Sequence, residues 1–155
     1  MTITAMCEKH LDAVVAIEAE VFSDPWSRAM FFQDLTADHA YCYVVVEDDV
    51  VIGYVDAWFV CDECTVNRIA FSKKYQRRGN GFKLLLYVMH EAVCRGVKTF
   101  LIDVRASNTA AQHLYEKAGF IKAGLRKAYY SDTLEDAVLM SMNTGNHHKV
   151  SHHDA

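Results

Sequence analysis

Apolar positions near the N-terminus follow a helical spacing. In residues 7–21 they fall on one face, which predicts an amphipathic helix. The pair Asp24-Pro25 marks the end of this helix. Ser27 can cap a second helix that runs to about Ala37, because a serine side chain accepts hydrogen bonds from the free amides of a first helical turn. We therefore predict two helices joined by a short loop.

A second pattern follows, in which β-branched and aromatic residues dominate. It covers residues 41–47 and 50–60, and the pair Asp48-Asp49 between them is typical of a tight turn. These two segments predict a β-hairpin. Residues 63–71 continue the pattern and predict a further strand beside it.

The second half of the chain alternates between helical and extended patterns. The predicted elements are a helix over residues 82–93 that ends before Gly96, a strand at 99–104, a helix from the Asn108 cap to Ala118, and a hairpin of 120–127 and 135–142. This succession predicts an α/β fold in which helices cover the faces of a mixed sheet. Residues 143–155 are rich in histidine and lack apolar periodicity, so we expect a disordered tail after a domain of residues 1–142.

Length and composition fit a single domain. The chain has 155 residues, of which 52% are hydrophobic and 23% charged, as in a globular protein. No apolar run is long enough to cross a membrane and the N-terminus lacks a secretory signal pattern, so we expect a cytoplasmic protein without membrane contact. Cys61 and Cys64 form a lone CxxC without a second ligand pair, and positions three apart on a strand point to opposite faces, so we expect no metal.

The distribution of charge points to one anionic ligand. The net charge of −4 argues against a nucleic-acid partner. Basic residues nevertheless gather within residues 73–83, which in an acidic chain indicates either one anionic ligand or a solvated turn. Residues 76–81 join a predicted strand to a predicted helix, whose free first amides and positive dipole end can bind phosphate. Gly79 and Gly81 would let the backbone approach such a ligand closely.

Two common phosphate loops do not fit this turn. A Walker loop requires Lys and then Ser or Thr after its last glycine, but Phe82 follows Gly81. The dinucleotide fingerprint requires a third glycine where Leu84 stands. The remaining pattern, Gln-x-x-Gly-x-Gly at residues 76–81, resembles the pyrophosphate signature of the GNAT acyltransferase superfamily.

Further motifs extend this resemblance over residues 1–142. The chain is similar to the ribosomal-protein alanine N-acetyltransferases of the RimI type. The matching motifs are F-S-D-P-W-S at 22–27, D-V-R-A-S-N at 103–108, L-Y-E-K-A-G-F at 114–120, Tyr129-Tyr130, and Glu135-Asp136-Ala137. The resemblance implies a mixed, mostly antiparallel twisted sheet of about seven strands flanked by about four helices. It also implies transfer of acetyl from acetyl-CoA to the N-terminal α-amino group of a protein, most directly the alanine of a small-subunit ribosomal protein.

The resemblance implies catalytic residues as well. Tyr115 would donate a proton to the departing thiolate, although its helical spacing also fits a core aromatic residue. The family base is a glutamate, and Asp103, one methylene shorter, stands at its position. Asp103 would act through a bridging water, or would instead pair with a basic neighbour such as Arg105. Glu63 is the reserve base.

The remaining implied site residues contact the two substrates. The residues implied for acetyl-CoA are Ile69, Ala70, Phe71, Gln76, Arg77, Arg78, Gly79, Asn80, Gly81, Phe82, Asn108 and Tyr115. Of these, the first three would pair with the pantetheine amides like an added strand. The residues implied for a peptide acceptor are Pro25, Trp26, Tyr129 and Tyr130, whose aromatic side chains alternatively cover the core.

Two other functions stay open at the level of sequence. The same fold and cofactor would serve a lysine or small-amine acetyltransferase, because they do not fix the acceptor. A non-catalytic acetyl-CoA-binding regulatory module would explain the missing glutamate. The pair Tyr129-Tyr130 favours a peptide acceptor, and Tyr115 argues against loss of catalysis.

Overall fold

The computed structural model of the protein describes residues 1–144. The elements are β1 (Thr2–Ala5), η1 (Glu8–His10), α1 (Leu11–Val21), α2 (Arg28–Leu35), β2 (Ala40–Glu47), β3 (Val50–Val60), β4 (Glu63–Phe71), η2 (Lys73–Tyr75), α3 (Asn80–Cys94), β5 (Thr99–Arg105), α4 (Thr109–Lys117), β6 (Ile121–Arg126) and β7 (Ala137–Asn143). The predicted tail lies outside the described residues from residue 145 onward. Its predicted first residue, Asn143, is the last residue of β7.

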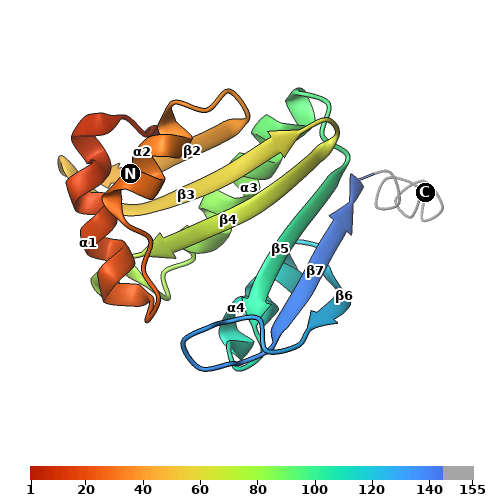
Figure 1. The fold of residues 1–155 in the computed structure, drawn as a ribbon. Helices are drawn as coiled ribbons and strands as arrows, with labels where there is room; N and C mark the ends of the chain where they lie inside the picture. Colours follow the sequence, from red (N-terminus) through yellow and green to blue (C-terminus); the bar gives the residue numbers. More distant parts are fainter. Residues whose placement is uncertain (145–155) are drawn as a thin grey trace.

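Seven strands form one sheet in the order β1-β2-β3-β4-β5-β7-β6 (Figure 1). Every neighbouring pair is antiparallel except β4 and β5, which run parallel, so the predicted mixed and mostly antiparallel sheet is confirmed. The sequence pattern did not predict β1. This strand has 4 residues, of which only Ile3 is partly buried, and is too short to show an alternating pattern.

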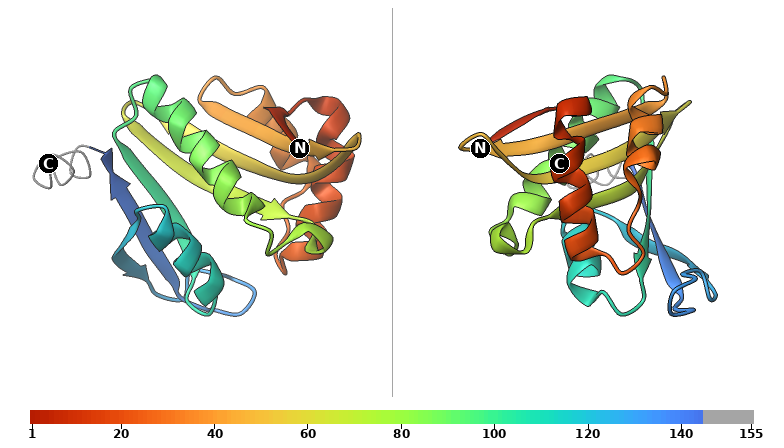
Figure 2. Two further views of the ribbon diagram at one scale, coloured as in Figure 1. Left: turned by 180° about the vertical axis from the view of Figure 1, so that it is seen from behind. Right: turned by 60° about the vertical axis from the view of Figure 1, so that its left-hand side comes forward.

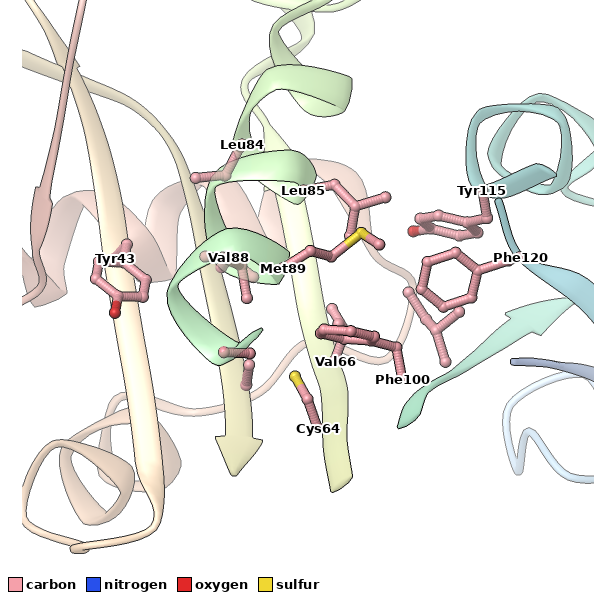
Figure 3. Packing of buried hydrophobic residues seen from close by; sticks show 14 of the residues in the cluster. Tyr43, Cys64, Val66, Leu84, Leu85, Val88, Met89, Phe100, Tyr115 and Phe120 are labelled. Atoms are coloured by element: carbon pink, nitrogen blue, oxygen red, sulfur yellow. The ribbon is translucent and has the colours of Figure 1, made fainter. Parts of the chain in front are cut away.

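Helices cover both faces of the sheet (Figure 1, Figure 2). α1 and α2 lie on one face, here called the front face, and α3 and α4 lie on the other, the rear face. Alternate side chains of β2 serve two cores, because Val44 packs with α1 and α2 whereas Val45 packs with α3. In the rear core, Leu85 and Met89 of α3 lie close to Tyr115 of α4 (Figure 3).

The two central parallel strands separate halfway along their length. β4 pairs with β5 only from Glu63 to Val66, and β3 pairs with β4 as far as Phe71. The register of β3 and β4 shifts between Asp56 and Ala57, close to the point where β4 leaves β5. Figure 1 shows β4 and β5 diverging toward their arrowheads. The β5-facing edge of residues 67–71 therefore has no strand partner within residues 1–144.

Candidate active site

An unpaired strand edge lies at the opening between β4 and β5. Ile69, Ala70 and Phe71 belong to it, and each keeps its register with β3 on the other side. An unpaired edge offers backbone N–H and C=O groups that can hydrogen-bond an extended ligand as a further strand would. The edge therefore suits a ligand chain that carries amide groups.

The turn that precedes α3 presents free backbone amides. Gly79 is the residue before the helix, with φ +77°, and as a glycine it has no side chain that could cap the first turn. Arg77 also has a positive φ, +63°, so two residues of the turn adopt the left-handed conformation. The first amides of α3 and the positive end of its dipole can bind an anion, as the sequence leads us to expect. Asn80, Gly81 and Phe82 are its first helical residues.

Of the side chains in this turn, one forms a hydrogen bond within the protein and two are exposed basic groups. The Gln76 amide donates to the Phe71 carbonyl at 3.0 Å and so ties the turn to the end of β4. Arg77 and Arg78 are exposed, and the Arg78 guanidinium lies 5.4 Å from the centroid of the Tyr75 ring. The basic groups therefore remain available to an anion at the helix start.

Asn108 stands at the start of α4. Its Oδ1 accepts a hydrogen bond from the Ala111 amide at 3.0 Å, which confirms the predicted helix cap. Its side-chain NH2 group has no partner among the described residues. The same side chain can thus cap the helix and still donate to a ligand.

Tyr115 points from α4 toward α3. It is 7% exposed, and its ring centroid lies 5.9 Å from that of Phe120. Figure 3 shows the hydroxyl directed toward Leu85 and Met89. The hydroxyl has no hydrogen-bond partner within residues 1–144, and its oxygen atom remains accessible to solvent. Burial, and secondly the charge of Tyr130, raises the pKa of Tyr115, so its hydroxyl is protonated at neutral pH and can act as an acid.

Asp103 lies on β5 and faces the front of the sheet. Its Oδ1 accepts a hydrogen bond from the Nε of Arg126 on β6 at 3.0 Å, whereas its Oδ2 has no partner in the described part of the chain. The alternative prediction that Asp103 pairs with Arg105 is therefore wrong. Arg105 contacts other carboxylates instead. Side chains two positions apart on a strand stand side by side and do not point at each other. The free oxygen can accept a hydrogen bond from water.

Asp103 and Tyr115 approach the opening from opposite faces. Tyr115 belongs to the rear core, and Asp103 alternates with the rear-facing residues Ile102 and Val104 of β5. Tyr130 links the two electrostatically, because burial first and the Asp103 charge second raise the pKa of Tyr130 to about 12. Asp103 and Tyr115 can therefore act on one substrate only at the opening where β4 and β5 separate.

Glu63 lies away from these groups. It is exposed at the start of β4 and pairs in register with Thr99, four positions before Asp103 on β5. At about 3.3 Å per residue, this places it roughly 13 Å from Asp103 along the strand. The structure thus does not bring Glu63 together with the other predicted catalytic residues.

Two loops stand beside Asp103 on the front face. The α1–α2 loop (residues 22–27) carries Pro25 and Trp26, and the β6–β7 loop (residues 127–136) carries Tyr129 and Tyr130. The Trp26 ring packs 5.3 Å from Phe31, so it partly covers the core, as the alternative interpretation expects. Pro25 and Tyr129 are exposed, and the two tyrosine rings meet edge to face at 5.2 Å.

A buried ion pair supports the α1–α2 loop and was not predicted from the sequence. Glu18 of α1 is fully buried and accepts hydrogen bonds from Tyr54, from the Arg68 Nε at 2.9 Å and from the Trp26 amide at 2.9 Å. Arg68 also donates to the Asp24 carbonyl at 3.0 Å. The signal in the sequence that could have indicated this ion pair is a glutamate on the apolar face of a predicted helix. A charge on that face becomes buried and therefore requires a partner.

The two cysteines of the CxxC motif do not lie on one strand, contrary to the expectation from the sequence. Cys61 is exposed in the turn between β3 and β4, whereas Cys64 is buried in β4, where burial raises the pKa of its thiol to about 12. In residues 1–144 no three His, Cys, Asp or Glu side chains gather as metal ligands would. The helices of this region are also too short or too polar to cross a bilayer.

Known proteins resemble this chain in both sequence and fold. The family model of the acetyltransferase (GNAT) family matches residues 11–120. Ribosomal protein bS18-alanine N-acetyltransferases are 36% identical in Salmonella typhimurium and 34% in Escherichia coli, in each case over 91% of this chain and 96% of the relative. The crystal structure of the ribosomal-protein-S18-alanine N-acetyltransferase from Escherichia coli matches with a TM-score of 0.86 over 92% of this chain and 93% of that one. The chain therefore belongs to the acetyl-CoA-dependent acetyltransferase (GNAT) family, and within it to the RimI-type branch.

Proposed function

We propose that this protein acetylates the N-terminal α-amino group of a protein, with an alanine-starting ribosomal protein as acceptor. The opening between β4 and β5 carries the proposal, because an unpaired strand edge, a helix start and the Tyr115 hydroxyl lie around it. The names of the relatives that are 34–36% identical support ribosomal protein bS18 as the acceptor. A ribosomal acceptor would also fit a cytoplasmic location.

Acetyl-CoA would lie along the opening. The amides of its pantetheine arm would pair with the edge formed by Ile69, Ala70 and Phe71, and the Asn108 side chain would donate to the same arm. Its pyrophosphate would bind the first amides of α3, with Arg77 and Arg78 nearby. This arrangement would place the thioester beside the Tyr115 hydroxyl.

The acetyl group would pass directly to the acceptor. A peptide α-ammonium group has a pKa of about 8 and must lose a proton before it can attack. Asp103 would take this proton through a water molecule held by its free oxygen. The amine nitrogen would then bond to the carbonyl carbon and the carbon–sulfur bond would break. The nitrogen would lose its remaining surplus proton to water as the amide forms, and Tyr115 would protonate the departing thiolate and regain a proton from solvent.

A peptide assay tests the acceptor. The protein would be incubated with acetyl-CoA and either a lysine-free peptide with a free N-terminal alanine or a matched peptide with a blocked N-terminus and one lysine. Mass spectrometry would then locate the acetyl group. We expect acetylation at the α-nitrogen of the first peptide. Acetylation confined to lysine would refute the proposal in favour of a lysine acetyltransferase, and acetyl-CoA binding without turnover would favour a regulatory module.

A further inference from the structure

Arg105 connects the two loops that stand beside Asp103. It follows Asp103 by two positions on β5, so both side chains face the front of the sheet. Its Nη2 lies 3.1 Å from the Asp24 Oδ1 and 2.9 Å from the Asp132 Oδ2. Because Asp24 belongs to the α1–α2 loop and Asp132 to the β6–β7 loop, one guanidinium group joins both.

The same guanidinium group makes further contacts within the β6–β7 loop. Its Nη1 lies 3.3 Å from the Thr133 hydroxyl and 3.6 Å from the Glu135 carboxylate. Its carbon lies 4.0 Å from the centroid of the Tyr130 ring. A planar group with five donors can satisfy several acceptors and stack on a ring at once, which the ammonium group of a lysine cannot do.

Charge explains why the loops depend on this residue. Three carboxylates, those of Asp24, Asp132 and Glu135, face one arginine, and its side chain is only 19% exposed. Without the positive charge these carboxylates would repel one another across the gap between the loops. Among the described residues, the one direct hydrogen bond between the two loops runs from Ser23 to Asp132, and Arg105 binds the same carboxylate.

We propose that Arg105 is a positioning residue that holds the α1–α2 and β6–β7 loops at the spacing needed by the acceptor. Within residues 1–144 its side-chain hydrogen bonds and ion pairs go to the two loops and not to the β4 edge or the start of α3, where acetyl-CoA would bind. It therefore governs binding of the acceptor and not of the donor. The inference rests on the proposed function, because it requires the acceptor amine to reach Asp103 between these loops.

Steady-state kinetics of Arg105→Met test this inference. Methionine keeps the apolar stem and removes the charged group. We expect the KM for the alanine peptide to rise about tenfold, which corresponds to about 1.4 kcal/mol, while the KM for acetyl-CoA stays unchanged. Arg105→Lys should fall between the wild type and Arg105→Met, because one ammonium group cannot hold both loops.

Arg95→Met is the matched control. Arg95 also pairs with a carboxylate, that of Glu91 at 2.9 Å, and lies over a tyrosine ring, that of Tyr41 at 4.8 Å, but it stands at the C-terminal end of α3. Its substitution should change neither KM. If Arg105→Met fails to fold, Asp24→Asn and Asp132→Asn replace it in the test, because each removes one of the two ion pairs of Arg105. Each of these variants should also raise only the peptide KM.

Two results would overturn the inference. One is an unchanged peptide KM in a folded Arg105 variant, and the other is an equal rise in both KM values. The double variant Arg105→Met with Asp24→Asn should bind the peptide no worse than Arg105→Met alone, since the shared contact is already lost. If the wild type acetylates no peptide N-terminus, the proposed function fails before any variant is compared.

Discussion

Tyr115 is a tyrosine whose hydroxyl makes no hydrogen bond within residues 1–144 although its ring is packed in the rear core. Because the hydroxyl stabilises nothing around it, Tyr115→Phe should leave the unfolding temperature nearly unchanged. Loss of a general acid should lower kcat by about 10²-fold or more, with a similar KM for acetyl-CoA. Thermal unfolding and steady-state kinetics check this pair of outcomes. An unchanged kcat would remove Tyr115 from the mechanism and leave it as a core residue.

Asp103 has two possible roles, proton acceptor and partner of Arg126, and they can be separated. Asp103→Asn should lower kcat by about 10²-fold, because an amide cannot accept the proton, whereas Asp103→Glu should retain activity through the longer carboxylate. Arg126→Gln removes the ion pair and leaves the carboxylate. If Asp103 serves only the ion pair, kinetic measurements would show the same loss for Asp103→Asn and Arg126→Gln.

The start of α3 can be tested by strain at a single glycine. Gly79 has φ +77°, and apart from its chain neighbours no described residue has a heavy atom within 4 Å of the place where a Cβ would stand, so Gly79→Ala adds backbone strain without a clash. Strain of about 1–2 kcal/mol should lower the stability and distort the amides of the first turn. We expect the KM for acetyl-CoA to rise, as measured by steady-state kinetics.

Gly96 supplies the control at the other end of α3. It has φ +92° and equally open surroundings, so Gly96→Ala should cost similar stability in thermal unfolding. Its KM for acetyl-CoA should stay at the wild-type value. A rise in that KM for both alanine variants would show that the effect reflects general destabilisation and not the turn.

Single elements were predicted well where the signal is local. The hairpin of β2 and β3, the cap of α4 at Asn108 and the turn before α3 all depend on residues close together in the chain, and the structure confirms them. α1 was predicted to start too early, because residues 8–10 form a 3₁₀ turn before it. Helical periodicity cannot separate such a turn from the helix that follows.

Contacts between distant elements were not predictable in the same way. Glu18 and Arg68 are 50 positions apart, and Asp24 and Arg105 are 81 positions apart. Neither spacing leaves a periodic signal, since only the packing of α1 and the two loops against the sheet brings the partners together. The resemblance of motifs indicated candidate site residues, but it could not show that Arg105 pairs with loop carboxylates and Arg126 with Asp103.

The ion pair of Glu18 and Arg68 joins α1 to the sheet, so its loss should lower the free energy of unfolding of the whole domain. Glu18→Gln leaves the Arg68 charge buried without a counter-ion, which typically costs about 3–5 kcal/mol. Denaturant unfolding should show this loss. Asp12→Asn is the control, because Asp12 is a carboxylate of the same helix paired with Arg28 at 3.1 Å but is 91% exposed. Its loss should cost less than about 1 kcal/mol, and equal effects would contradict the buried pair as the source of stability.

A second buried carboxyl group affects the molecule in a different way. Asp56 of β3 is fully buried and accepts hydrogen bonds from the Asn67 amide at 3.2 Å and from the Cys42 thiol at 3.5 Å. Its acidic neighbour is Asp34 of α2. Burial, followed by this carboxyl neighbour, raises the pKa of Asp56 to about 8, so the folded protein keeps the group protonated at neutral pH.

The raised pKa of Asp56 gives the stability of the protein a predictable dependence on pH. The unfolded chain releases this proton near pH 3.8, and the folded chain releases it only near pH 8. Between these values the unfolded state binds fewer protons, so the free energy of unfolding should fall as the pH rises and should level off above pH 8. Asp56→Asn resembles the protonated group and cannot titrate, so its advantage over the wild type should grow between pH 4.5 and 8. Denaturant unfolding at several pH values would measure it, and parallel curves for the two proteins would show that Asp56 ionises in the folded state as easily as in the unfolded chain.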